Sequence, residues 1–417
     1  MMSDIVASQY RYQSAVVVNE TTGLRVDVSA AIAELQLYEN ITSIGISGKI
    51  LIVDNLNLFD RINFSGTETL DIEVLSDATG TTIKKSFVMV NVDNKKVVND
   101  ETISYVFSLM SKPVFISNLQ VLSKAYEGTP LQIIGKILTG NLGVSLDKTL
   151  LEGTDPVQEN MSVISPYLTP IETIQWIRNM CTTEGSGFPF FLFGTIHSDD
   201  IKVTSLENIM NKQPEFNRPF IYSGAIANTQ DTIKKLFTIE QIEYNDNSST
   251  LTSVISGAVG AKYEVLDTVY GTSNDNKQFK IEDALPDTKL YDTRFKIDDK
   301  KISEFESNYI FSVVAPTMAD ANGYGYNKDT NKLKSKVLRN GVLQALNMNG
   351  SVIKVNGLPF MASKSVGPGS VISIEVVQFF NNRYVVDDKK SGRFIISSLD
   401  HQFFDEKHTV TLGVSKL

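Results

Sequence analysis

Histidines are the residues most able to carry chemistry here, because histidine is both a common metal ligand and a general base near neutral pH. The chain contains only His197, His401 and His408, and none lies at metal-ligand spacing from a cysteine or from another histidine on a helix. His401 and His408 flank the turn FDEK, so a hairpin would place them face to face. A zinc site would need further ligands that are not evident. We predict strand-packing or surface roles for the histidines, with no metal and no cofactor.

Paired acids are the next candidates, because glycoside hydrolysis requires two carboxylates about 5–10 Å apart in a cleft. The pairs are Asp199–Asp200, Asp298–Asp299 and Asp387–Asp388. All three lie in polar, turn-like segments. We predict solvated loops at these positions.

Two glycine-rich stretches resemble phosphate-binding loops at first sight. In SVGPGSVISIEVV (Ser365–Val377), Pro368 removes one N–H donor, and the residues that follow alternate as in a half-buried strand. In GTPLQIIGK, the spacing between Gly128 and Gly135 is wrong for a nucleotide loop, and neither Ser nor Thr follows Lys136. These stretches predict turns before a strand and a helix, without a nucleotide.

Charge and composition narrow the class of protein further. The 417 residues have a formal net charge of −9, which argues against binding nucleic acid through its phosphates. The basic run Lys332, Lys334, Lys336 and Arg339 is more typical of a solvated helix face than of a DNA site. Neither a signal peptide nor a membrane-spanning apolar run is evident, which predicts folding in the cytoplasm and no membrane partner. The single cysteine, Cys181, excludes an intramolecular disulfide and is expected as a buried structural thiol.

The elements that position these residues are mostly strands. The first 110 residues or so alternate in short segments separated by turns, which favours a barrel or sandwich. After Pro113, capping boxes predict two helices: Thr129 with Gln132, expected to stop at Gly140, and Thr169 with Glu172. The polar stretch 258–330 is expected as a loop-rich insertion. A helix then precedes a return to strands.

One internal echo bears on the architecture. TLDIEV (Thr69–Val74) and VISIEV (Val371–Val376) share an alternating frame, and each follows a turn that contains glycine. Together with the all-β character of both ends, this predicts two related β units around an α+β middle.

The segment SGKILIVDNLNLFDRINFSGTETLDIEV resembles the central baseplate hub proteins of contractile-tailed bacteriophages. The match is carried by Gly48, Asp54, Gly66 and Glu68. Towards the C-terminus, the turn at Pro368 and Gly369 and the segment GRFIISSLDHQF, which contains His401, resemble the second barrel and closing hairpin of the same family and of related secretion-system spike proteins.

The resemblance implies a β-rich α+β fold with two tail-tube-type β-barrels. The expected division is a first barrel at 10–117, an α+β connector at 118–220, a second barrel formed by 221–257 with 331–417, and the insertion at 258–330. It also implies a homotrimer without catalytic activity, in which six barrels form a ring between the sixfold tail tube and the threefold central spike, and DNA passes through the lumen without specific binding. The alternatives are another tube initiator or adaptor, and a cell-wall glycan hydrolase.

Overall fold

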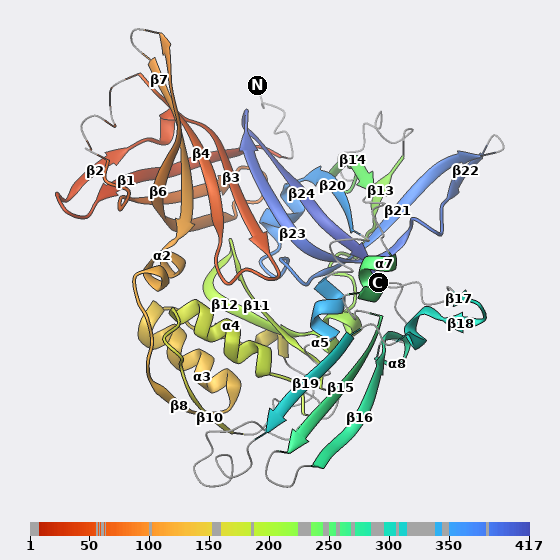
Figure 1. The fold of residues 1–417 in the computed structure, drawn as a ribbon. Helices are drawn as coiled ribbons and strands as arrows, with labels where there is room; N and C mark the ends of the chain where they lie inside the picture. The colour runs from red at the N-terminus through yellow and green to blue at the C-terminus, as the bar shows by residue number, and fades with distance from the viewer. Residues whose placement is uncertain are drawn as a thin grey trace.

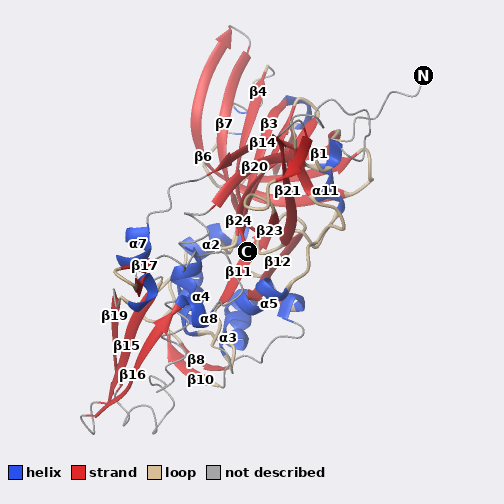
Figure 2. Ribbon diagram, turned by 90° about the vertical axis from the view of Figure 1, so that its right-hand side faces the viewer, coloured by secondary structure: helices blue, strands red, loops and turns tan. Residues whose placement is uncertain are grey.

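The structure is a computed structural model, and the described part of the chain comprises residues 8–55, 57, 59, 62, 64–99, 102–151, 160–184, 187–223, 235–244, 250–255, 259–267, 272–284, 296–305, 308–314, 338–343, 350–380 and 383–417. Strands dominate both ends of the chain, and helices gather in the middle (Figures 1 and 2).

The N-terminal strands make a first sheet unit. In most of them the side chains alternate between buried and accessible, as the sequence alternation predicts, so one face is available for a core. The buried cluster includes Leu35, Ile50, Ile72 and Phe107, each 3% exposed or less. The strands are β1 (Tyr10–Asn19), β2 (Leu24–Asp27), β3 (Ile32–Asn40), β4 (Ser47–Asp54), β5 (Thr69–Ser76), β6 (Thr82–Asn99) and β7 (Thr102–Ser111).

A second sheet unit contains the C-terminal strands and has its own core. Phe220, Ile353, Ile374 and Val410 belong to that core, which is distinct from the first cluster. The strands are β13 (Phe220–Tyr222), β14 (Ile239–Tyr244), β20 (Gly350–Asn356), β21 (Val371–Phe380), β22 (Arg383–Val386), β23 (Gly392–Phe404) and β24 (Lys407–Lys416), with the short helix α11 (Leu358–Ala362) between β20 and β21.

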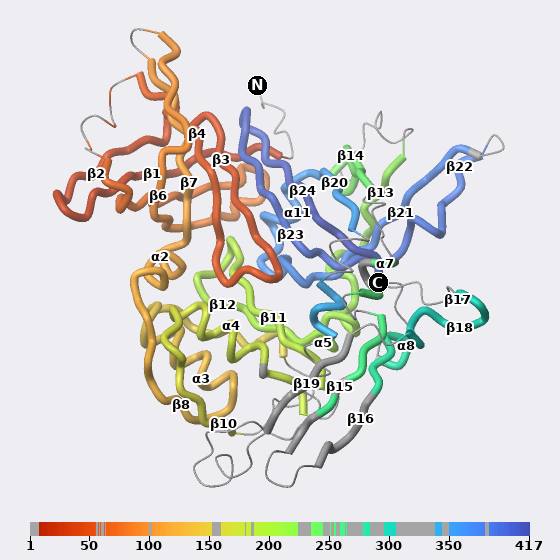
Figure 3. Tube along the Cα trace, viewed as in Figure 1, coloured from red at the N-terminus to blue at the C-terminus, as the bar shows by residue number. Residues whose placement is uncertain are grey.

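The two units are hydrogen-bonded into one 14-stranded sheet. The connection is made by β23, which pairs with two different strands along the same edge. Gly392–Ile395 pair with β21 of the second unit, and Ser398–Phe404 pair with β3 of the first unit. Figure 3 shows the N-terminal and C-terminal strands side by side at this point. The strands of the described residues close into no barrel, so the sequence prediction of two barrels is supported only as two sheet units.

The middle of the chain is the α+β region that the capping boxes predicted. Both boxes are present, with Thr129 accepting from Gln132 N and Thr169 from Glu172 N. Gly140 does not end the first helix, because the chain continues in a π turn (Leu138–Leu142) and Gly143 takes the left-handed conformation, with φ +69°. The elements are α2 (Lys112–Asn118), β8 (Ala125–Gly128), α3 (Pro130–Ile137), β9 (Leu146–Asp147), β10 (Met161–Ile164), α4 (Pro170–Met180), β11 (Phe190–Thr195), β12 (Ser198–Ser205) and α5 (Leu206–Asn211).

The stretch expected as a loop-rich insertion contains regular structure. Three strands form a separate sheet in the order β16 (Thr272–Lys280), β15 (Gly260–Asp267) and β19 (Asn308–Val314), and Ala261 and Phe279 are buried. The expectation of loops rested on polar stretches between and within these strands, although β19 itself (NYIFSVV) is apolar. Lys332, Lys334 and Lys336 lie outside the described residues, whereas Arg339 is buried and therefore is not on a solvated helix face. The remaining elements are α7 (Thr250–Ile255), α8 (Ile281–Ala284), β17 (Lys296–Ile297) and β18 (Lys300–Lys301).

The two sheet units repeat one strand order. The first is ordered β3-β4-β7-β6-β5-β1 and the second β14-β20-β24-β23-β21-β13. Corresponding strands also occur in the same order along the chain, with β1 and β13 first in their units. All corresponding pairings are antiparallel except the last, since β1 pairs with β5 antiparallel whereas β13 pairs with β21 in parallel. A shared order of this length is the signature of an internal duplication.

Bulges at matching places support the duplication. The β6–β7 ladder skips Val90 beside the pair Met89–Leu109, and the β23–β24 ladder skips Ser397 beside the pair Ile396–Val414. The β3–β4 and β14–β20 ladders also skip one residue each, Ala33 and Glu240. Bulges are built features of a fold and not random defects, so their agreement fixes the alignment of the two units.

This alignment places the sequence echo correctly. Thr69 pairs with the residue before Met89, and Val371 pairs with the residue before Ile396. TLDIEV and VISIEV therefore occupy equivalent positions in β5 and β21, as the sequence analysis predicted.

Candidate functional site: the repeated turns and the junction

The motif residues from the two ends of the sequence form the same turn in the two units. The backbone oxygen of Glu68 accepts from Met89 N at 2.8 Å, and that of Ser370 accepts from Ile396 N at 2.9 Å. Each side chain also accepts from the N–H three residues earlier, in Ser65 and Gly367 respectively. Gly66–Glu68 and Pro368–Ser370 are thus counterparts, in the two glycine-containing turns that precede the sequence echo.

Glu68 holds its turn through its carboxylate. The oxygens accept from the backbone N–H of Ser65, Gly66 and Thr67, from the Ser65 hydroxyl and from the Asn19 amide, at 2.8–3.2 Å. Burial opposes ionisation of Glu68, but these hydrogen bonds outweigh it and lower the pKa of the carboxyl group. Gly66 has φ +85°, a conformation that favours glycine. The G-x-E motif is therefore a structural anchor for the start of β5.

The other two motif residues of the first unit lie in β4, away from this turn. A side chain at Gly48 would come within 2.5 Å of the Gln36 backbone oxygen, so glycine permits the close approach of β3 and β4. Asp54 ends β4 with only 1% of its surface exposed and accepts from Phe59 N at 3.2 Å. Gly48 therefore has a packing role, and Asp54 caps the turn that follows β4.

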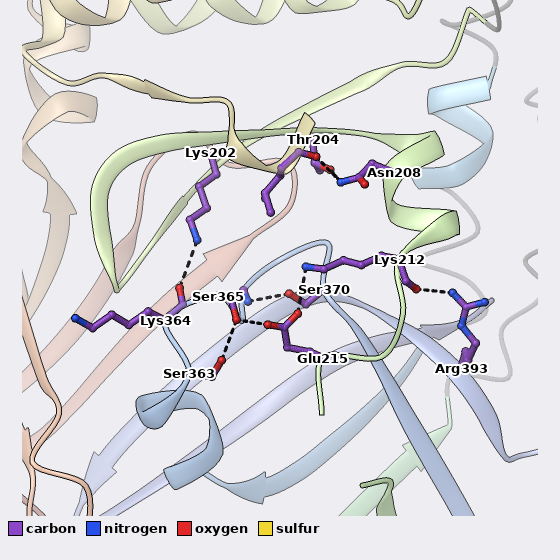
Figure 4. Close-up of polar contacts among 12 residues, drawn as sticks. Lys202, Thr204, Asn208, Lys212, Glu215, Ser363, Lys364, Ser365, Ser370 and Arg393 are labelled. Carbon is purple, nitrogen blue, oxygen red and sulfur yellow. Dashed lines mark hydrogen bonds and ion pairs between the residues drawn. The ribbon is translucent and has the colours of Figure 1, made fainter. Parts of the chain in front are cut away.

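The Pro368–Gly369 turn lies where the second unit meets the α+β region (Figure 4). Gly369 has φ +78°, and its N–H donates to Ile396 O at 2.8 Å. A Cβ at this position would contact the side chains of Ile41 and Ile209. Beside it, Ser365 hydrogen-bonds to Glu215. The cavity at this turn, about 10 Å³, has room for about one water and not for a nucleotide. Ser365–Gly369 thus form a turn before β21, as the sequence predicted.

His401 lies in a buried polar cluster at the joint between β3 and β23. Its Nδ1 is 3.2 Å from His408 Nε2, and its Nε2 is 3.8 Å from Glu39 Oε1. Glu39 accepts from Ile196 N at 2.6 Å, so the cluster also contacts the β11–β12 hairpin. The predicted contact between the two histidines across their hairpin is confirmed, although they are diagonal neighbours and not direct cross-strand partners, and both are buried.

Burial controls the protonation of this cluster. It raises the pKa of Glu39 to about 7, against the lowering effects of the Ile196 hydrogen bond and of Lys85 and Lys202. It lowers the pKa of His408 to about 3 and that of His401 well below its ordinary value, with a further contribution from the neighbouring histidines. The two histidines are therefore neutral near pH 7, and Glu39 changes from neutral to charged as the pH rises through about 7. Among the described residues, no group of three or more metal-ligating side chains is placed to hold a metal ion.

Glu39 was missed by the sequence analysis although a signal was present. In the alternation of β3, Glu39 shares the inward face with Leu35 and Leu37. A charged residue at an inward position is uncommon and requires a partner.

Two of the three acid pairs, Asp298–Asp299 and Asp387–Asp388, lie in turns as predicted, whereas Asp199 and Asp200 lie at the start of the strand β12 and not in a loop. Asp387 accepts from the backbone N–H of Lys389 and Lys390, and Asp299 occupies a left-handed turn between β17 and β18. Asp199, whose side chain is 83% exposed, forms an ion pair with Lys85 at 2.7 Å. These carboxylates cap turns or bind lysine.

Within the described part of the chain, no helix is both long and apolar enough to cross a membrane. Cys181 is buried at the end of α4, as predicted.

Comparisons with known proteins give the class of fold. No protein-family model matches the chain, and no curated protein matches it in sequence. The tail protein from Neisseria meningitidis MC58 has a similar structure, with a TM-score of 0.55 and 10% identity over 98% of this chain and 97% of that one. The 43 kDa tail protein of prophage MuSo2 from Shewanella oneidensis gives 0.53 and 9%, over 97% and 98%. The chain therefore has a tail-protein fold along nearly its whole length, which confirms the resemblance found in the sequence at the level of fold.

Proposed function

We propose that the chain is a structural subunit of a phage tail baseplate hub. Three copies would form a ring of six sheet units that joins a sixfold tail tube to a threefold central spike. The observation that carries the proposal is the duplicated strand order with its matching bulges, because two equivalent units per chain convert threefold into pseudo-sixfold symmetry. The tail-protein fold supports the same role.

The proposed domains follow the same division. The first unit would correspond to 10–117, the connector to 118–220 and the second unit to 221–257 with 331–417, while 258–330 is an added segment. Separate buried clusters in the first unit, the connector and the second unit support this division.

A lumen for DNA is compatible with the charge of the joint. Segments 34–40 and 398–404, which pair with each other, contain neither lysine nor arginine and carry Glu34 and Asp400 on the face opposite Glu39. If this face lines the lumen, it would not retain the phosphates of passing DNA.

The hydrolase alternative is less well supported. Burial and the nearby Glu34 raise the pKa of Asp400 to about 6, which is the kind of acid that a glycosidase uses. Asp400 and Glu34 lie on an open sheet face and line neither of the two hollows beside α3. Those hollows have volumes of about 640 and 480 Å³, and the only carboxylate among their lining residues is Glu127. We therefore propose a role without catalysis.

The test is the mass of the purified chain by light scattering, followed by negative-stain imaging of the same fraction. A threefold particle with six lobes on one face supports the hub. A chain that remains a compact monomer after the candidate spike protein is added would contradict it.

A further inference from the structure

Each sheet unit has at least one strand edge without a strand partner among the described residues. β5 pairs with β6 only as far as Val88, so the edge of β6 beyond that point has no neighbouring strand, while β7 pairs along the other edge. β14 is the terminal strand of the large sheet. Unpaired edges are templates for addition of another strand.

We propose that the edge of β6 at 91–97 pairs antiparallel with β14 of a second copy of this chain. The proposal deepens the hub function and rests on it. Inside one chain, β23 of the second unit already pairs with β3 of the first unit. Because β6 corresponds to β23 and β14 corresponds to β3, the same interface recurs between copies. It is head-to-tail, so it continues from copy to copy until a ring closes.

The internal interface predicts the register. Leu109 of β7 and Val414 of β24 occupy equivalent positions beside the matching bulges. Ser104 and Thr409 precede them by the same number of residues, so Ser104 and Thr409 are also equivalent. Their partners on the neighbouring strands, Lys96 in β6 and Gln402 in β23, are therefore equivalent. The same comparison applies to β3 and β14, the strands on the other side of the interface. Lys49 of β4 and Val352 of β20 are equivalent, so their partners, Gln36 in β3 and Glu243 in β14, are equivalent too.

Gln402 faces Gln36 within the chain, and the next pair is Phe403 with Leu35. The corresponding pairs between copies are Lys96 with Glu243 and Val97 with Ile242.

The chemistry of these pairs fits contact. Lys96 and Glu243 are exposed and carry opposite charges. Val97 is 65% exposed, and Ile242 is partly buried. An apolar pair next to an opposite-charge pair is a favourable cross-strand arrangement. The internal counterpart of the apolar pair, Phe403 and Leu35, is buried in the first core.

Disulfide cross-linking tests the register. The double variant Val97→Cys with Ile242→Cys should, on mild oxidation, give covalent species that end at three chains, because directly opposite residues are close enough to be bridged. Mixing the two single variants should give only linked dimers. The matched control is Asn94→Cys with Ile242→Cys, since Asn94 is also exposed but, in the regular pairing of 94–97 with β7, lies on the face of β6 opposite Val97.

The outcomes separate this inference from the proposed function. Cross-linking of the Val97→Cys double variant at least tenfold faster than that of the Asn94→Cys double variant supports the β6–β14 interface. A trimer by light scattering that shows no such preference for position 97 would overturn the interface and leave the hub standing. A monomer without cross-linking at any concentration would overturn both.

Charge exchange gives a second readout. Lys96→Glu or Glu243→Lys alone should weaken assembly about tenfold or more, because like charges then face each other across the strands. The combined variant should recover most of the loss. Equal weakening in all three variants would contradict the pairing.

Discussion

At the scale of the residue, Glu68 has more hydrogen-bond partners than any sequence pattern could indicate. The G-x-E motif located it, but its neighbours come from the turn and from Asn19 in β1. Glu39 shows the reverse case, because its inward position could be read from the alternation of β3 whereas its partners, Ile196 and His401, are distant in sequence. A sequence can show which buried polar residue needs hydrogen-bond partners more readily than it can show which residues those partners are.

Replacement of Glu68 by Gln should destabilise the first unit by about 1–3 kcal/mol, since the amide loses one acceptor oxygen in a buried, fully occupied site. The lowered pKa of Glu68 also makes the carboxylate stabilise the fold above its ordinary pKa of 4.5, and this contribution is lost as pH falls through the lower, folded value. Urea unfolding between pH 3 and 6 should show a flatter pH dependence in the variant.

The control for this experiment is Asp71→Asn, which changes a side chain that is 49% exposed in the same strand and should have little effect. Equal stability of Glu68→Gln and the wild type at pH 6 would show that the carboxylate does not anchor the turn.

At the scale of the element, the two helices that begin with a capping box, α3 and α4, were the easiest features to predict. A capping box is a local signal, so Thr129 and Thr169 could be recognised without knowledge of the fold. Most strands followed from their alternation for the same reason. The strands of the stretch 258–330 were missed because β16 is polar and because polar segments such as KIDDKK separate the more apolar β15 and β19.

Thr169→Ala should lower the free energy of unfolding by about 1 kcal/mol, because α4 loses the hydroxyl that accepts from Glu172 N. Thr169→Ser retains that acceptor and should restore most of the stability. Urea titration followed by circular dichroism measures both. If the serine variant is no more stable than the alanine variant, the cap does not contribute as described.

At the scale of the whole molecule, the sequence predicted two related units but not the way in which they join. The echo TLDIEV/VISIEV fell on equivalent strands because it reflects local packing in each unit. The division of β23 between β21 and β3 depends on pairing between opposite ends of the chain, and no local pattern specifies such a register.

The joint between the units should respond to pH through Glu39. Because burial raises its pKa to about 7, Glu39 contributes stability fully below its ordinary pKa of 4.5 and loses that contribution as pH rises through about 7. Glu39→Gln should therefore gain stability relative to the wild type as pH rises from 4.5 to 7.5, by on the order of 3 kcal/mol. Urea unfolding at several pH values measures the difference.

The buried histidines act in the opposite direction, because their lowered pKa values remove stability as pH falls below about 6.5. They are present in both proteins, so their effect cancels in the difference. A difference that does not change with pH would mean that Glu39 is not protonated on folding.

The ladder between β3 and β23 also has a mechanical consequence. Hydrogen bonds between antiparallel strands lie across the strand direction, so a force that slides one unit along the other must strain all bonds of the ladder together. A force that lifts one end of the ladder breaks them in succession. The joint thus resembles a lap joint, which is strong in shear and weak in peel, and a load transmitted along these strands would meet its stiffest direction.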